Sequence, residues 1–239
     1  MEAEKQLGIY GKLPMHGDFI HRNLPTTFIT IWDEWLQLFV AGSKEQMGDD
    51  WLNIYLTSPI WRFVLSSGVV DEKHWAGIML PSVDQVGRYY PFSVAMPLEP
   101  QINPLEFMTL NTHWYEQIED LSLQALDDQF SVDELVDKAS LIEFNSTMSY
   151  LKTGQLMDAN ALHINMQFAE KSPMSVYAHF LDSLLLKTMN SYSMWATAGS
   201  ERISPCLFNV QNLPSVSNIP AMMDGQWPHR GWSQTYTSQ

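Results

Sequence analysis

The sequence predicts an α/β fold in which helices pack on the faces of a β-sheet. Short apolar runs of strand length are interleaved with stretches of helical periodicity along the chain, and a sheet covered by helices is the stable arrangement for that pattern. Hydrophobic residues make up 45% of the 239 residues, which is enough for a substantial core. Because no internal repeat or low-complexity linker interrupts the chain, we expect a single domain over residues 1–239.

The first helix is predicted over residues 26–40. Apolar side chains recur there at helical spacing, and Pro25 and Gly42 supply start and stop signals on either side. The side chains expected to form its apolar face are Phe28, Ile31, Trp32, Trp35, Leu36 and Phe39. Tryptophans on such a face are predicted to pack in the core and not to bind a ligand.

Several apolar runs are predicted to be strands of a mixed, largely antiparallel sheet. Three of them follow one another with Gly- and Pro-containing turns between them, as in a meander. The predicted strands are 7–10, 61–66, 75–80, 89–96, 161–168, 192–196 and 206–210. The tail after the last strand is rich in loops, and we expect Trp227 and Trp232 to cover a sheet edge.

An acidic helical block follows the meander. Asn103 as a cap and Pro104 at the first helical position open one long helix, and Ser131 with Glu134 has the spacing of a capping box that opens a second. The face expected to be buried in the long helix carries Leu110, Trp114, Ile118 and Leu121. Residues 99–143 hold eleven Asp or Glu and one Lys, which predicts solvated helix faces and a helical subdomain within 101–150. Another helix is predicted over 173–189.

The composition excludes several classes of partner. The formal net charge of −14 opposes binding to nucleic acid or to an anionic membrane, because affinity for phosphates comes largely from Lys and Arg. With Cys206 as the one cysteine, no intrachain disulfide forms, which fits a reducing compartment. Neither a signal peptide nor an apolar run of about 20 residues is present. We expect a cytoplasmic protein without membrane insertion.

The sequence lacks the strongest motifs of four common enzyme classes. It lacks the phosphate-binding P-loop, the dinucleotide-binding glycine motif, the nucleophile elbow and the zinc-protease helix motif. We therefore expect no enzymatic activity and no cofactor. One alternative stays open, a metal-dependent or other hydrolase that uses His16, Asp18 and His21 or the loop with Asp84 and Arg88. The competing interpretation is that the first three are polar residues of an exposed loop.

Two segments have compositions too specific for ordinary connectors. They are Gly8-Ile-Tyr-Gly-Lys-Leu-Pro-Met-His-Gly-Asp-Phe-Ile-His-Arg22 and Leu80-Pro-Ser-Val-Asp-Gln-Val-Gly-Arg-Tyr-Tyr-Pro-Phe92. With Trp32-Asp33-Glu34-Trp35-Leu36, and with Ser193-Met-Trp195, Gly199-Ser200, Met223-Asp224-Gly225 and Gly231-Trp232 in the tail, the chain resembles the TagF (ImpM) family of type VI secretion-associated proteins.

The resemblance implies a three-layer α/β/α sandwich and a non-enzymatic, post-translational repressor of type VI secretion. Family members are understood to bind the cytoplasmic forkhead-associated scaffold protein of the apparatus, so that protein is the expected partner. A third possibility is a structural adaptor whose acidic helices dock a basic partner, for which binding would weaken steeply with salt.

The two motifs also have a physical interpretation of their own. Glycine permits backbone angles that other residues avoid and proline fixes its own φ, so both segments are expected to be shaped, stiff loops. The predicted partner-binding residues are Lys12, Asp18, Arg22, Ser82, Asp84, Arg88 and Tyr89. Two interpretations stay open: these residues hold strand ends together, or they form a shared recognition surface, since binding residues are often on loops of a rigid scaffold.

Overall fold

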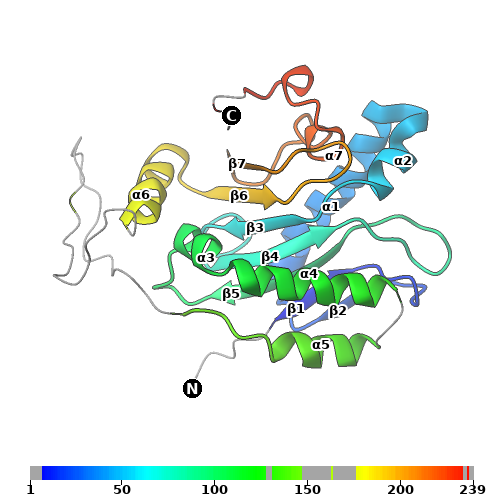
Figure 1. Cartoon of the computed structure of the whole chain (residues 1–239), viewed down its shortest axis with the longest axis horizontal. Helices are drawn as coiled ribbons and strands as arrows, with labels where there is room; N and C mark the ends of the chain where they lie inside the picture. Colours follow the sequence, from blue (N-terminus) through cyan, green and yellow to red (C-terminus); the bar gives the residue numbers. More distant parts are fainter. Residues whose placement is uncertain (1–6, 128–130, 147–162, 164–175, 234–235, 237–239) are drawn as a thin grey trace.

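The computed structural model describes residues 7–127, 131–146, 163, 176–233 and 236. A seven-stranded sheet in the order β2-β1-β5-β4-β3-β6-β7 forms its centre (Figure 1). The strands are β1 (Gly8–Gly11), β2 (Ile20–Arg22), β3 (Trp61–Leu65), β4 (His74–Leu80), β5 (Phe92–Leu98), β6 (Tyr192–Thr197) and β7 (Cys206–Gln211). The mixed sheet expected from the sequence is wrong for this part of the chain, because every strand pair is antiparallel.

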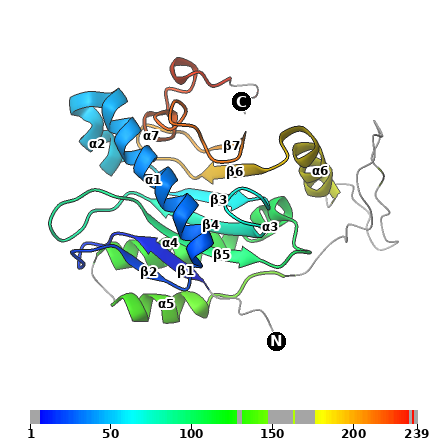
Figure 2. The same cartoon turned by 180° about the vertical axis from the view of Figure 1, so that it is seen from behind.

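Helices cover both faces of the sheet. On one face lie α3 (Pro104–Leu110), α4 (Thr112–Leu126), α5 (Val132–Ser140) and α6 (Tyr177–Met189) (Figure 1). On the other lie α1 (Thr26–Met47), α2 (Trp51–Leu56) and α7 (Ala221–Asp224), with short 3₁₀ turns at Gly48–Asp50 and Pro228–Arg230 (Figure 2). Each face has its own buried apolar cluster, so the described chain is a mixed α/β fold with a core on either side of the sheet.

Helix α1 carries the aromatic residues predicted for it. Trp32 and Trp35 are buried, and their indole N–H groups donate to Ser93 Oγ and to the Pro214 carbonyl, respectively. Ile31 is 38% exposed and lies off the apolar face, contrary to the prediction. The helix also continues past Gly42 to Met47. Gly42 is a packing site and not a stop signal, since a Cβ there would lie 2.4 Å from a methyl group of Val216.

The predicted long helix after Pro104 is two helices. Chain direction changes at Asn111, whose amide donates to the carbonyls of Phe107 and Asn145 and accepts from the backbone N–H of Asn145. Leu110 is therefore exposed, which corrects its predicted place on the buried face, while Trp114 and Ile118 are buried as predicted. The Asn103 cap and the Ser131–Glu134 capping box are both confirmed.

Some other strands and helices begin or end at different residues from those predicted, or were not predicted. β5 begins at Phe92 and not at Tyr89, since Tyr89 and Tyr90 belong to the loop before it. The closing hairpin is confirmed as β6 and β7. The sequence interpretation missed β2, α2 and α7. Apart from His163, the predicted strand 161–168 lies outside the described residues, as do residues 173–175 of the predicted last helix.

The tail packs against the edge strand β7, as expected of its tryptophans. The rings of Trp227 and Trp232 lie 5.5 Å and 4.7 Å from that of Phe208. Asp224 orders this segment through an ion pair with Arg230 of 2.8 Å. Within the described ranges, no helix combines the length and apolar character needed to cross a membrane.

Candidate protein interaction surface

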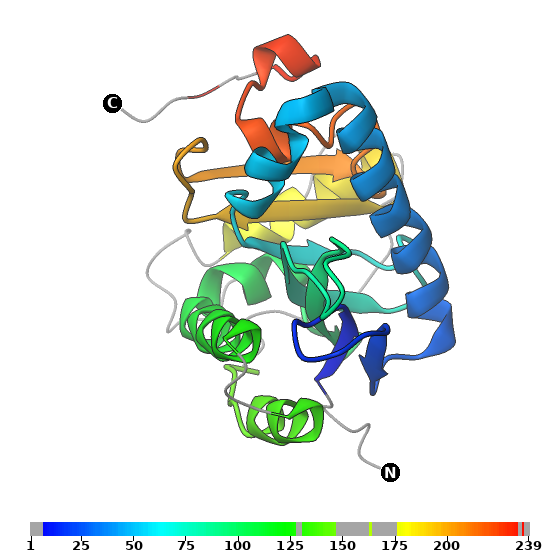
Figure 3. The ribbon, with the colours of Figure 1, turned by 90° about the vertical axis from the view of Figure 1, so that its right-hand side faces the viewer.

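The two sequence motifs form neighbouring loops at one end of the sheet. The first loop, residues 12–19, joins β1 to β2, and the second loop, residues 81–91, joins β4 to β5. Because β1 pairs with β5 in an antiparallel sense, the end of β1 lies beside the start of β5. Both loops therefore project from the same end of the molecule, on the right in Figure 1 and toward the viewer in Figure 3.

Gly11 permits this close approach of the loops. Its φ of 132° lies in the region that favours glycine, and a Cβ at this position would lie 2.2 Å from the Pro91 carbonyl oxygen. Any other residue would collide with the backbone of the second loop. A glycine is thus required at the end of β1 by contact with Pro91, which lies 80 residues further along the chain.

A buried carboxylate, that of Asp84, joins the loops. Its Oδ2 accepts hydrogen bonds from Lys12 Nζ at 2.7 Å and from Arg88 Nε at 2.6 Å. Its Oδ1 accepts from the backbone N–H groups of Val86 and Arg88. Burial alone would raise the pKa of Asp84, but the hydrogen bonds from Lys12 and Arg88 outweigh it and hold the pKa well below its ordinary range. The group is ionised at neutral pH and compensates two cations.

This pKa shift makes the loop structure sensitive to acid. A depressed folded pKa adds stability above the unfolded carboxyl pKa of about 4, and that contribution is lost as pH falls toward the folded pKa. We expect Asp84→Asn to be less stable than the wild-type chain by a constant amount from pH 7 to about 5, and by a shrinking amount below about pH 4. Urea unfolding at several pH values measures this difference. A difference that stays constant down to pH 3 would contradict it.

Further hydrogen bonds fasten the loops to each other and to the helices. The backbone N–H of Gln85 donates to the His16 carbonyl at 3.1 Å, and Arg88 Nη2 donates to the Gly17 carbonyl. Ser82 Oγ donates to the Lys12 carbonyl at 2.7 Å. The hydroxyl of Tyr55 in α2 both donates to the Ser82 carbonyl and accepts from the Ser82 N–H. The two loops are therefore bonded to each other and to α2 of the same chain.

An aromatic cluster lies beneath the first loop. Tyr10 and Tyr90 both donate their phenol hydrogens to the carboxylate of Asp33 in α1. Burial, reinforced by this carboxylate, raises the pKa of both phenols, so they stay protonated. The ring of Phe19 packs on its edge against Tyr90 at 4.8 Å, and Lys12 Nζ lies 4.9 Å from the Phe19 ring centre.

The predicted site residues divide by burial. Lys12, Ser82 and Asp84 are at most 4% exposed, so in this structure they hold the loops together. Asp18 and Arg88 are exposed and their side chains approach to 4.0 Å. The other two predicted residues lie apart from this pair. Arg22 is exposed and donates to Asp133 of α5 at 3.2 Å, and Tyr89 is half-buried against Trp51 and Tyr55.

The sequence interpretation missed three apolar residues at the loop tips. Met15, Phe19 and Val86 are 56%, 48% and 68% exposed. Their position in turns between glycines and prolines was a signal that they do not belong to a strand or helix face. Their exposure depends on how the two loops pack, which the local sequence does not reveal. Apolar side chains displayed on an ordered loop are typical of protein contact sites.

Two kinds of reactive group, a metal-binding cluster and an activated thiol, can be compared with the described structure. Nowhere in the described ranges do three or more His, Cys, Asp or Glu side chains come together to hold a metal ion, and this includes His16, Asp18 and His21. Burial raises the pKa of the Cys206 thiol to about 11, so the thiol is protonated and weakly nucleophilic at neutral pH.

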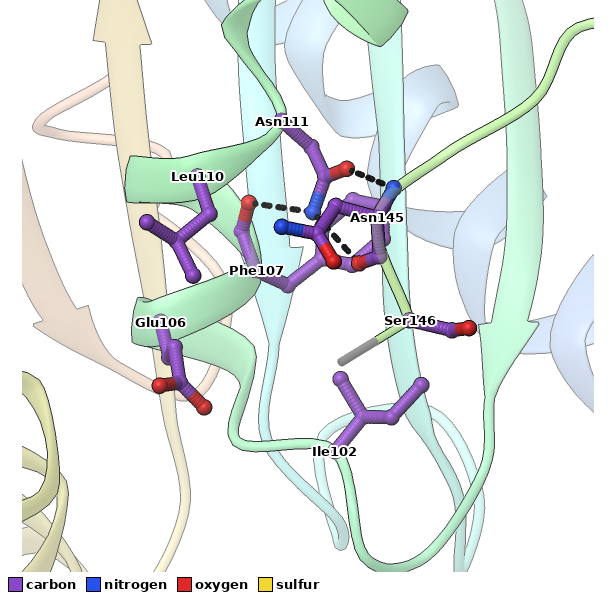
Figure 4. A pocket seen from close by; sticks show the side chains of 7 residues that line it. All are labelled: Ile102, Glu106, Phe107, Leu110, Asn111, Asn145 and Ser146. Atoms are coloured by element: carbon purple, nitrogen blue, oxygen red, sulfur yellow. Dashed lines mark hydrogen bonds between the residues drawn. The ribbon is translucent and has the colours of Figure 1, made fainter. Parts of the chain in front are cut away.

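A pocket between α3 and the segment after α5 is occupied by structural contacts. It is lined by Ile102, Glu106, Phe107, Leu110, Asn111, Asn145 and Ser146 (Figure 4). The amide of Asn111 serves both the Asn145 backbone and the Phe107 carbonyl. The carboxylate of Glu106 lies 3.3 Å from Nε2 of His179 in α6. These groups hold α3, α6 and the segment after α5 together.

Comparison with known proteins identifies a family and a similar fold. Residues 8–142 match the TagF N-terminal domain, described as type VI secretion system-associated. The fold is similar to the crystal structure of PA0076 from Pseudomonas aeruginosa PAO1, with a TM-score of 0.73 and 30% sequence identity over 92% of this chain and 94% of that one. No curated protein matches the chain.

Proposed function

Because the chain belongs to the TagF family of type VI secretion system-associated proteins, we propose that it is a cytoplasmic, non-enzymatic repressor of type VI secretion. It acts by binding the forkhead-associated scaffold protein of the apparatus. The family resemblance further implies a three-layer α/β/α sandwich, and helices on both faces of the sheet support that description (Figure 3).

One observation carries the proposal: the most distinctive sequence motifs build two loops that are held together and ordered before any partner binds. Asp84 and its two cationic partners fix the loops internally, and the loop tips display apolar side chains to solvent. Groups ordered before binding lose less entropy on association, which favours affinity. Such a surface suits contact with another protein.

Repression then follows from mass action. A partner that binds one form of the scaffold stabilises that form by an amount that grows with the partner's concentration relative to Kd. At about 100 times Kd this amounts to about 2.7 kcal/mol, enough to hold nearly all of the scaffold in the bound form. The scaffold is thereby kept from its activating partners without any covalent change.

Deleting the gene is expected to raise secretion of the system's effectors, and affinity capture on the tagged chain is expected to recover the scaffold protein. Secretion is measured by immunoblot of culture medium, with a strain lacking the secretion apparatus as the control. Restoring the gene on a plasmid should restore repression. Unchanged secretion in an otherwise active strain, together with capture that lacks the scaffold, would disprove the proposed function.

The second candidate is a metal-dependent or other hydrolase that uses His16, Asp18 and His21 or the Asp84 and Arg88 loop. Asp84 is ionised, but Lys12 and Arg88 side chains already bind its Oδ2, and the backbone N–H groups of Val86 and Arg88 bind its Oδ1. Metal analysis of the purified chain separates the two functions. Zinc or manganese at one ion per chain would favour the hydrolase, and a His16→Ala variant that loses the ion would locate the site.

A further inference from the structure

The exposed apolar residues of the loops lie beside an exposed ion pair. Met15 and Phe19 belong to the first loop and Val86 to the second, and the loops are joined beside them by the bond from Gln85 N–H to the His16 carbonyl. Asp18 is fully exposed and lies 4.0 Å from Arg88, which is also paired with the buried Asp84. The loop tips therefore combine apolar contact area with exposed charged groups.

The acidic helices reach the same end of the molecule. α4 ends and α5 begins on the side from which the loops project (Figures 1 and 3). The exposed ion pair between Arg22, three residues after Phe19, and Asp133 in the first turn of α5 ties that helix to the loop region. Asp127, at the end of α4, is exposed as well. The end of the molecule that carries the apolar loop tips thus also carries the end of α4 and the start of α5.

From this arrangement we infer that the loop tips, with Met15, Phe19 and Val86 at the centre and the acidic helices α4 and α5 at the border, dock a protein surface that carries apolar side chains flanked by Lys or Arg. The inference rests on the proposed function for the identity of the partner, the scaffold protein. It adds where that partner binds and what its contact surface is made of.

Charge complementarity favours this occupant over a second copy of the chain. A net charge of −14 repels another copy and attracts a basic surface. Interfaces also concentrate their energy in a small central group of side chains that lose contact with water on binding, and charges at the border mainly set orientation and rate of encounter. The apolar centre is expected to determine affinity, and the acidic border to select a basic partner.

The test compares opposite charges at one position with the same changes elsewhere. Val86→Lys and Val86→Asp remove the same apolar contact and differ in sign. Leu207→Lys and Leu207→Asp repeat the changes at a similarly exposed residue (59%) on β7, the sheet edge opposite the loops. Binding of each full-length variant to the purified scaffold protein is measured by calorimetry, and the Tm of each variant reports its folding.

Val86→Lys is expected to raise the Kd at least about tenfold, more than Val86→Asp does, and both Leu207 variants are expected to bind like the wild-type chain. Binding should also weaken as salt is raised, because screening shortens the range of border charges. If Val86→Lys does not fold, Met15→Lys replaces it, since Met15 is 56% exposed.

The outcomes separate this inference from the proposed function. Scaffold binding that both Val86 variants leave unchanged would overturn the docking surface and leave the function standing. A loss as large for Val86→Asp as for Val86→Lys would overturn the basic character of the partner surface. A chain that sediments as a dimer, and that Val86→Lys converts to a monomer, would assign the surface to a second copy. No binding by the wild-type chain would overturn both proposals.

Discussion

Asp84→Ala is expected to lower the Tm by on the order of 10 °C and to abolish binding of the scaffold protein. The substitution leaves Lys12, which is 4% exposed, without the carboxylate that compensates its charge. It also frees Arg88 and the two backbone N–H groups that define the turn of the second loop. Calorimetric unfolding of the purified variant measures the first effect, and affinity capture measures the second.

The matched control is Asp18→Ala in the first loop. Asp18 carries the same charge but is fully exposed and 4.0 Å from Arg88, and exposed ion pairs contribute little to stability. We expect a Tm change of less than about 2 °C. Equal changes for the two variants would show that Asp84 does not organise the loops.

Glu119→Lys is expected to destabilise the chain by about 2–4 kcal/mol, because it sets a second cation against Arg62. Arg62 Nε and Nη2 donate to the two carboxylate oxygens of Glu119 at 2.6 Å and 2.7 Å, and both side chains are only 17% exposed. The guanidinium also lies 5.5 Å from the Tyr115 ring centre. This ion pair fixes α4 on β3, so its loss loosens the helix. Urea unfolding measures the effect.

Asp120→Lys is the control for that change, since it makes the same charge reversal at the next residue, which is exposed. We expect it to change the free energy of unfolding by less than about 1 kcal/mol. Comparable losses for the two variants would mean that general charge balance, and not the Arg62 pair, accounts for the effect. Glu119 therefore does not belong to the solvated acidic face that the sequence predicted, and Asp120 represents that face in binding experiments.

The elements that local sequence predicts well are those with strong periodicity or a complete capping signal. Trp32 and Trp35 mark the buried stripe of α1 by their spacing alone, and Ser131 with Glu134 marks the start of α5. Gly42 and Asn111 show where this fails. Gly42 was a stop signal in the sequence, yet the contact with Val216 makes a small residue necessary inside the helix. Asn111 ends α3 because its amide binds the backbone of Asn145.

The sequence predicted which residues belong to the candidate site but not how they are arranged. The sequence singled out Lys12, Asp84 and Arg88 as charged groups on shaped loops, and it left open whether they hold the strand ends or bind a partner. The structure buries Lys12 and Asp84 and exposes Met15 and Val86, which the sequence interpretation had not singled out. Lys12 and Asp84 are charged but buried, whereas Met15 and Val86 are apolar but exposed, which is the reverse of the usual pattern. Only the packing of the two loops decides which of these side chains is buried.

By itself the sequence determined the family, the order of most strands and helices, and the concentration of acid in one helical block. These follow from periodicity, caps, turn residues and motif spacing, all of which act over a few residues. The tertiary structure alone decided the all-antiparallel sheet, the burial of Asp84 and the surface of the loop tips. The physical reason is that these features depend on residues far apart along the chain. Lys12 and Asp84 are 72 residues apart, and they come into contact only when β1 pairs with β5.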